Sequence, residues 1–221
     1  MVLLSAKLVS GLALLRQFAS RLTVRRDTAP IDSVEALYGF VSTRAAFVAQ
    51  KKLYGYLKAR MGTRYPSMFE DEAFVASVNI AKMHVFAAAL SDLAVHAVAR
   101  VGAGSALDDA CRHGLAQRCF RAGLADNAAE MRDEATLAAW LTAFDARLEG
   151  VQWANLVAGG DAFSESPRAL LHWAPIADRL KRYDAEIVEN SIRFAWIEIR
   201  RDLARRLDAR AVAADAALES G

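Results

Sequence analysis

The chain has 221 residues, of which 54% are hydrophobic and 24% charged, with only 4 Pro and 12 Gly. This composition excludes a disordered protein, a collagen-like fibre and a small disulfide-stapled domain, and the length suffices to bury a core without staples or metals. The two cysteines, Cys111 and Cys119, give no disulfide framework and are typical of a reducing compartment, which predicts a cytoplasmic protein.

The net charge of +2 conceals an uneven distribution. Residues 1–60 carry ten Lys or Arg against three Asp or Glu, a balance of +7, whereas the remaining residues have a balance of −5. A surface of one sign attracts the opposite sign whatever the fold. The basic third therefore indicates an anionic lipid surface, an acidic protein or the acidic rest of the same chain as its partner. No zinc-finger spacing, bZIP heptad array or RNA-binding aromatic signature is present, so nucleic acid is not expected.

Helical periodicity dominates the whole chain, and no run shows sustained strand alternation. The sequence predicts an all-α fold, a single-domain bundle of about six to eight helices with a long C-terminal helix. The first predicted helix spans residues 3–24, with leucines along one side and no acid before Asp27. We accordingly divide the chain into an amphipathic basic N-terminal helix, residues 1–26, and an all-helical globular domain, residues 27–221.

The later helices are predicted over residues 32–61, 67–100, 105–122, 128–149, 167–173, 175–182 and 184–209, with a loop over residues 150–166. Three of the starts rest on capping pairs three residues apart. These pairs are Asp32 with Glu35, Ser67 with Glu70, and Ser105 with Asp108.

Two apolar segments raise the question of a membrane. Lys82 and Asp92 lie within the apolar stretch Ala73–Ala99, and each would cost about 2.5–3.5 kcal/mol near a bilayer centre. This favours a buried helix of a soluble bundle, with no transmembrane span. Residues 1–26 fit a packed first helix, a helix lying in a membrane interface, or a targeting segment, and these three interpretations stay open.

The most regular feature is a stripe of alternating aromatic and basic residues over residues 40–58. The aromatic set is Phe40, Phe47 and Tyr54, and the basic set is Arg44, Lys51 and Lys58. Spacings of 4 and 3 place both sets on one face of a helix. Cations beside aromatic rings can bind phosphate or a lipid head group, which makes these six residues a candidate anion-binding site. The alternative is that the rings belong to the core and the cations extend to its edge.

A second candidate site is formed by His84, Asp92 and His96. Their spacings of eight and four place them on one broad helical face, where imidazole and carboxylate can share a proton or a divalent metal. A pair of Glu-x-x-His motifs, the usual metal signature of helical bundles, is absent. A hydrogen-bonded Asp92–His96 pair in the core is therefore favoured, and no metal or other cofactor is expected.

The stretch Tyr54-Gly-Tyr-Leu-Lys-Ala-Arg-Met-Gly-Thr-Arg-Tyr-Pro-Ser-Met-Phe-Glu-Asp, continued by Asn79-Ile-Ala-Lys-Met-His84, resembles uncharacterised helical proteins of GC-rich alphaproteobacteria. The resemblance covers about residues 25–100 and the last helix. Some of these proteins are labelled esterases, but this chain has no G-x-S-x-G motif, so no catalytic residue carries over. The resemblance implies a bacterial origin, which favours an interfacial N-terminal helix over a transit peptide.

The sequence thus predicts a non-enzymatic adaptor or assembly factor whose basic N-terminal third docks on an anionic membrane, at the inner face, or on an acidic protein. The rival hypothesis is a hydrolase or metal-dependent enzyme using His84, Asp92 and His96. A third is a binder of an apolar ligand held between the second, third and last helices. Whether the protein forms a homo-oligomer stays open.

Overall fold

The computed structural model describes residues 28–127, 133–158 and 161–219. The helix predicted over residues 3–24, and with it the N-terminal division 1–26, lies outside these ranges. Within them the secondary structure is helical and contains no strand, which confirms the prediction of an all-α bundle.

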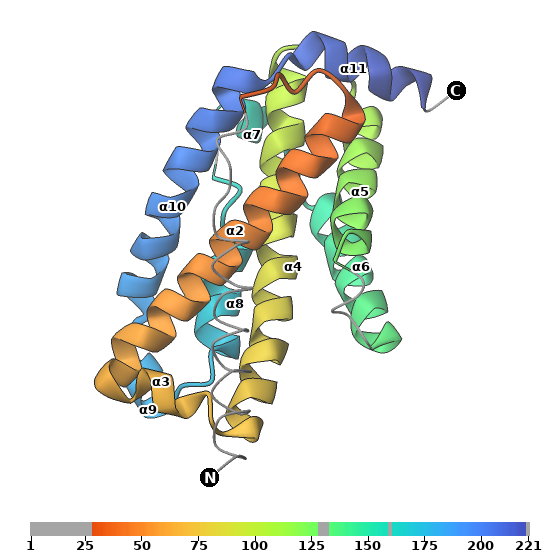
Figure 1. Ribbon diagram of the computed structural model, residues 1–221. Helices are drawn as coiled ribbons and strands as arrows, with labels where there is room; N and C mark the ends of the chain where they lie inside the picture. The colour runs from red at the N-terminus through yellow and green to blue at the C-terminus, as the bar shows by residue number, and fades with distance from the viewer. Residues whose placement is uncertain (1–27, 128–132, 159–160, 220–221) are drawn as a thin grey trace.

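Figure 1 shows the helices in chain order. Their bounds are α2 (Val34–Met61), the 3-10 helix η1 (Gly62–Arg64), α3 (Tyr65–Met68), α4 (Glu72–Ala103), α5 (Asp109–Ala125), α6 (Glu134–Glu149), α7 (Trp153–Val157), α8 (Glu165–Trp173), α9 (Asp178–Lys181), α10 (Ala185–Arg206) and α11 (Ala209–Leu218).

Three helix starts differ from the predicted capping pairs, because another side chain supplies the cap. Helix α2 is capped by Ser33, whose Oγ accepts a hydrogen bond from the N–H of Ala36. Helix α4 begins at Glu72, whereas the pair of Ser67 and Glu70 predicts a start at residue 67. The cap is Asp71, whose carboxylate accepts hydrogen bonds from the N–H groups of Ala73 and Phe74. Asp108 caps α5 in the same way, through the N–H of Cys111. An ionised carboxylate at this position also interacts favourably with the helix dipole.

The C-terminal helix is not continuous to residue 209 as predicted. Helix α10 ends at Arg206, and Leu207 adopts an extended conformation that pairs with Ile31. Asp208 then caps a separate helix, α11, by accepting from two backbone N–H groups. A short helix, α7, also lies within the predicted loop over residues 150–166.

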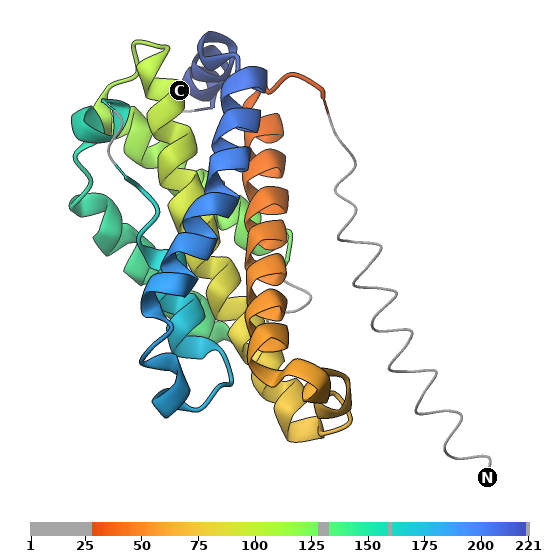
Figure 2. The ribbon, with the colours of Figure 1, turned by 90° about the vertical axis from the view of Figure 1, so that its left-hand side faces the viewer.

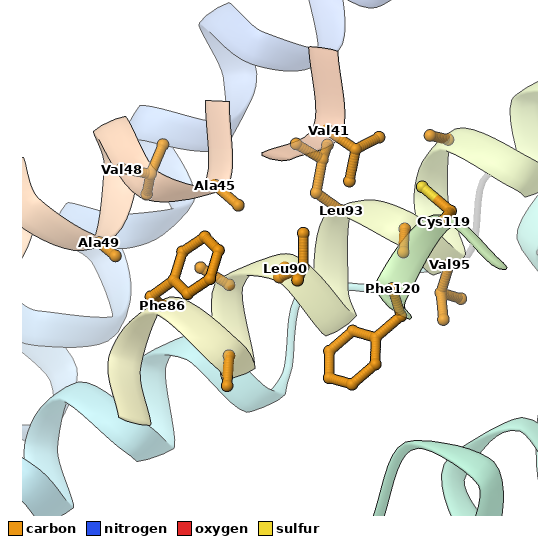
Figure 3. Close-up of a cluster of buried hydrophobic side chains, with 14 of the residues drawn as sticks. Val41, Ala45, Val48, Ala49, Phe86, Leu90, Leu93, Val95, Cys119 and Phe120 are labelled. Carbon is orange, nitrogen blue, oxygen red and sulfur yellow. The ribbon is translucent and has the colours of Figure 1, made fainter. Parts of the chain in front are cut away.

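Helix α4 occupies the centre of the bundle and packs against α2, α5 and α8 (Figures 1 and 2). Figure 3 shows part of the core between these helices, to which α2 contributes Val48, α4 contributes Leu90 and α5 contributes Phe120. At Gly123 of α5 the backbone approaches α4 so closely that a Cβ would lie 2.5 Å from Cδ1 of Leu90. The close packing of α5 on α4 therefore depends on a glycine at this position.

By length and apolar composition, α4 could cross a membrane. Both properties are also those of the core helix of a soluble bundle. Its Asp92 side chain is fully buried and bonds to residues of α6 and α8, and Lys82 is also buried. These contacts are the kind that a central bundle helix makes.

Helices α2 and α10 lie side by side, and polar contacts join them along their length (Figure 2). Near one end, the carboxylate of Asp184 accepts hydrogen bonds from the Tyr56 hydroxyl and the Arg60 guanidinium, both at 2.6 Å. In the middle, Nζ of Lys52 donates to Oγ of Ser191 at 3.0 Å. The position of α10 on the bundle is therefore set by α2 as well as by the core.

Candidate functional site

The first two residues of the aromatic and basic stripe are part of the α2–α10 contact. Arg44 is only 7% exposed, and its guanidinium donates to Asp202 of α10 at 3.0 Å. The buried Phe40 ring is in contact with two guanidinium groups, those of Arg44 and Arg206, each 5.4 Å from the ring centroid. Asp202 also pairs with Arg206, so one carboxylate and one ring hold both arginines. Arg44 and Phe40 thus fasten α10 to α2.

The remaining stripe residues lie nearer to solvent. Lys51 and Lys58 are exposed, Phe47 and Tyr54 are half-buried, and the Lys51 ammonium lies 5.2 Å from the centroid of the Phe47 ring. A seven-residue repeat drifts by about 20° per heptad around a straight α-helix. The stripe therefore turns away from α10 between Arg44 and Lys58, which separates a buried end from an exposed end.

Asp92 is a buried structural carboxylate whose partners come from α6 and α8. It accepts from the Arg147 guanidinium at 2.9 Å and from the backbone N–H groups of Glu165 and Ser166 at 3.1 and 2.8 Å. Burial raises the pKa of the Asp92 carboxyl, whereas Arg147 and the N–H donors act against that rise. The carboxylate thereby joins the start of α8 to α4 and α6, and it does not form the predicted pair with His96.

The Asp92 cluster continues to α10 through one further hydrogen bond. The indole N–H of Trp196 donates to Oγ of Ser166 at 3.2 Å, and both side chains are buried. On the other side, Arg147 donates to Oγ of Ser91 and to the carbonyl of Ala162, each at 2.6 Å. Every group in this cluster has a partner in the fold, which is the expected state of a buried polar network.

His84 lies between two tryptophans. The Trp140 indole N–H donates to Nδ1 of His84 at 3.2 Å, and the ring of Trp173 stacks on the imidazole at 3.4 Å between centroids. Burial, and secondarily His172, lower the pKa of His84. The imidazole is therefore held by aromatic contacts, and no carboxylate of the described ranges is paired with it as a general base of the predicted kind would need.

His96 is buried against the Phe163 ring, whose centroid lies 5.0 Å from its own. Burial, followed by the nearby charges of Arg200 and Arg100, lowers the pKa of His96 to about 4, and Asp161 acts in the opposite direction. His84, Asp92 and His96 thus each have separate surroundings. Among the residues that the structure describes, no group of three or more His, Cys, Asp or Glu side chains is placed to hold a metal ion.

One pocket of the described chain lies between α2 and α4, where an apolar ligand was predicted. A pocket between these helices, lined by Gln50, Lys82, Phe86, Asn127 and two further residues, has a volume of about 10 Å³. That is the space of about one water molecule. Buried side chains of α2, α4 and α10 belong to one continuous hydrophobic cluster. This pocket is thus too small for a lipid or quinone.

Sequence reasoning missed several of these partners. Arg147 holds Asp92, and Trp140 and Trp173 hold His84, yet their spacing from α4 in the chain gives no sign of contact. The one usable signal in the sequence was the position of Asp92 in the middle of an apolar helix. A carboxylate buried there needs a cationic or N–H partner from another part of the chain.

Comparisons of the chain with protein-family models, curated proteins and solved structures found no match. The resemblance to alphaproteobacterial helical proteins therefore stays a prediction, and the function has to be argued from the residues themselves.

The buried His96 predicts a pH dependence of stability. In the unfolded chain a histidine titrates near its ordinary pKa of about 6.5, whereas in the fold His96 titrates near 4. Between these values the unfolded state binds more protons, so the free energy of unfolding falls as pH drops from 6.5 to 4. The loss attributable to His96 is on the order of 3 kcal/mol.

Urea unfolding followed by circular dichroism at pH 7, 5.5 and 4.5 measures this effect. A His96→Asn variant should show a flatter pH dependence than the wild type, because asparagine does not titrate. Equal pH dependence in the two proteins would contradict the assignment.

Proposed function

We propose that the protein is a non-enzymatic helical adaptor that docks on an anionic membrane surface through its basic N-terminal third. The observation that carries the proposal is the exposed end of the stripe on α2. Lys51 and Lys58 face solvent, and no carboxylate among the described residues lies within 4.0 Å of either ammonium group. Arg64, in the turn after α2, is exposed as well.

The charge of residues 1–26 supports the same function. This segment carries Lys7, Arg16, Arg21, Arg25 and Arg26 and no acid. Each Lys or Arg near an anionic lipid surface contributes about 1 kcal/mol of attraction. Within residues 28–60, Arg44 and Arg60 are neutralised by Asp202 and Asp184, whereas Lys51 and Lys58 keep their charge at the surface.

The alternative functions have less support. An enzyme built on His84, Asp92 and His96 would need these side chains to reach a substrate together. Asp92 is fully buried, and the three have separate partners. A binder of apolar ligands would need a larger space than the pocket beside Lys82 and Phe86.

Vesicle co-sedimentation tests the proposal with the full chain. We expect binding to vesicles that contain phosphatidylglycerol and little binding to vesicles of phosphatidylcholine alone. The double variant Lys51→Gln, Lys58→Gln should bind the anionic vesicles about 30-fold more weakly at low salt, since about 1 kcal/mol is lost for each lysine.

The matched control is Arg121→Gln with Arg168→Gln, which removes two exposed positive charges from α5 and α8. The control should bind as the wild type does. Equal binding to both kinds of vesicle, or binding to neither, would overturn the proposal. An equal loss in the control would show attraction by net charge without a docking surface.

A further inference from the structure

Helix α10 exposes a row of large apolar side chains that the bundle does not cover. These residues, which we term the α10 strip, are Ile187, Phe194 and Ile197 of α10 and Tyr183 in the turn before it, with exposures of 68%, 70%, 38% and 69%. Their spacing keeps them on one side of the helix, opposite the buried seam formed by Val188, Ile192, Trp196, Ile199 and Leu203. Several large apolar side chains exposed on one side of a helix indicate an interaction surface.

The strip lies beside the exposed end of the stripe on α2. Lys52, the neighbour of Lys51 in the chain, donates to Ser191, which lies between Ile187 and Phe194 on α10. Figure 2 shows the two helices next to each other on the outside of the bundle. The apolar strip and the exposed lysines of α2 therefore belong to adjoining parts of the surface.

The charges around the strip have a small positive excess. The exposed arginines are Arg179, Arg182, Arg193, Arg200, Arg201 and Arg205. The carboxylates at the surface of the same segment are Asp178, Glu186, Glu189, Glu198 and Asp202, of which Glu189 is paired with Arg193 at 2.6 Å, Asp202 with Arg205 and Asp178 with Lys181. An occupant with negative charge is thus favoured over a neutral or positive one.

This charge decides between three occupants. Residues 1–26 could reach the strip, because the described chain begins beside the end of α10, where Ile31 pairs with Leu207. That segment is itself basic, however, and would bring like charges together. A second copy of the chain, docked through its own α10 strip, would also bring like charges together. An anionic lipid surface complements the arginines and accepts the apolar side chains.

We infer that the α10 strip inserts into the interfacial region of an anionic membrane, with the flanking arginines on the lipid phosphates. The inference rests on the proposed function and names the part of the fold that enters the bilayer. Exposed aromatic and aliphatic side chains gain free energy when they leave water, and tyrosine is favoured at the level of the head groups. The lysines of α2 then supply attraction, and α10 supplies the anchor.

The test uses the double variant Ile187→Gln, Phe194→Gln, which keeps α10 charges and helix propensity. Both side chains are mainly exposed, so the fold should persist, and circular dichroism checks this. Binding to phosphatidylglycerol vesicles should weaken by about tenfold or more, since burial of two large apolar groups is lost. The matched control is Ile80→Gln with Leu218→Gln, two exposed apolar residues on α4 and α11, which should bind as the wild type does.

The outcomes separate this inference from the proposed function. If the wild type binds anionic vesicles and the α10 variant binds equally well, the inference is overturned and the function proposed above stands. If the wild type does not bind, the proposed function fails, and the inference with it. A dimer of the wild type that the α10 variant abolishes, seen by light scattering without lipid, would make a second copy the occupant and also overturn the inference.

Discussion

Replacement of Asp92 by asparagine is expected to lower the free energy of unfolding by about 3–5 kcal/mol. The carboxylate is fully buried and compensates the Arg147 guanidinium, whose side chain is 17% exposed. Asparagine removes that charge and turns one acceptor into a donor that faces the N–H groups of Glu165 and Ser166. The start of α8 would then lose its anchor on α4. Urea unfolding at pH 7 measures the change.

A second variant shows whether the loss comes from an unpaired arginine. Addition of Arg147→Met to Asp92→Asn should cost less than the sum of the two single changes, because the second change removes the charge left without a partner. Asp145→Asn is the matched control, since its carboxylate accepts from Gln117 in a partly exposed position. Additive effects, or a loss from Asp92→Asn no larger than that of the control, would contradict this role of Asp92.

The substitution Gly123→Ala should have opposite effects on stability in the wild type and in a Leu90→Ala protein. Leu90→Ala alone is expected to lower the free energy of unfolding by about 3 kcal/mol, the usual size for a buried leucine. Gly123→Ala alone should lower it by about 1–2 kcal/mol, because the new Cβ would lie 2.5 Å from Leu90. In the Leu90→Ala protein that space is free, and Gly123→Ala should raise stability by about 1 kcal/mol through helix propensity.

Gly114 of α5 provides the control for this cycle. A Cβ at Gly114 would meet no atom nearer than 3.5 Å, and that atom is at the flexible end of Arg118. Gly114→Ala should therefore stabilise the protein in both backgrounds. If Gly123→Ala had the same sign in both backgrounds, the close approach of α5 to α4 would not be the constraint described above.

The local structure of α10 could be predicted from its sequence because periodicity records which side of a helix is buried. Val188, Ile192 and Leu203 recur at helical spacing along residues 184–209, and all three are buried. The end of the helix could not be predicted in the same way. Leu207 fits the apolar period, but it leaves the helix to pair with Ile31, a residue that lies far away in the chain.

The candidate sites were less predictable because their partners lie on other helices. The spacing of Arg44 and Phe40 is that of a ligand-binding face, yet the ion pair with Asp202 occupies Arg44. Asp92 was predicted to pair with His96, one turn away, and pairs with Arg147 instead. Short-range spacing predicts which side chains can meet on one helix, but it carries no information on which helices pack together.

The contacts between α2 and the C-terminal third also set the order in which the chain can assemble. Arg60 and Asp184 are separated by 124 residues, Arg44 and Asp202 by 158, and Val34 and Asp215 by 181. The contacts of α2 with α4 and α5 close much shorter loops, so they cost less chain entropy and can form first. During synthesis, α2, α4 and α5 are made well before α10. Arg44 therefore has no carboxylate partner until Asp202 of α10 has been synthesised. A chain that stops before Asp202 would leave the Arg44 guanidinium without its carboxylate partner, beside a core that lacks the buried side of α10.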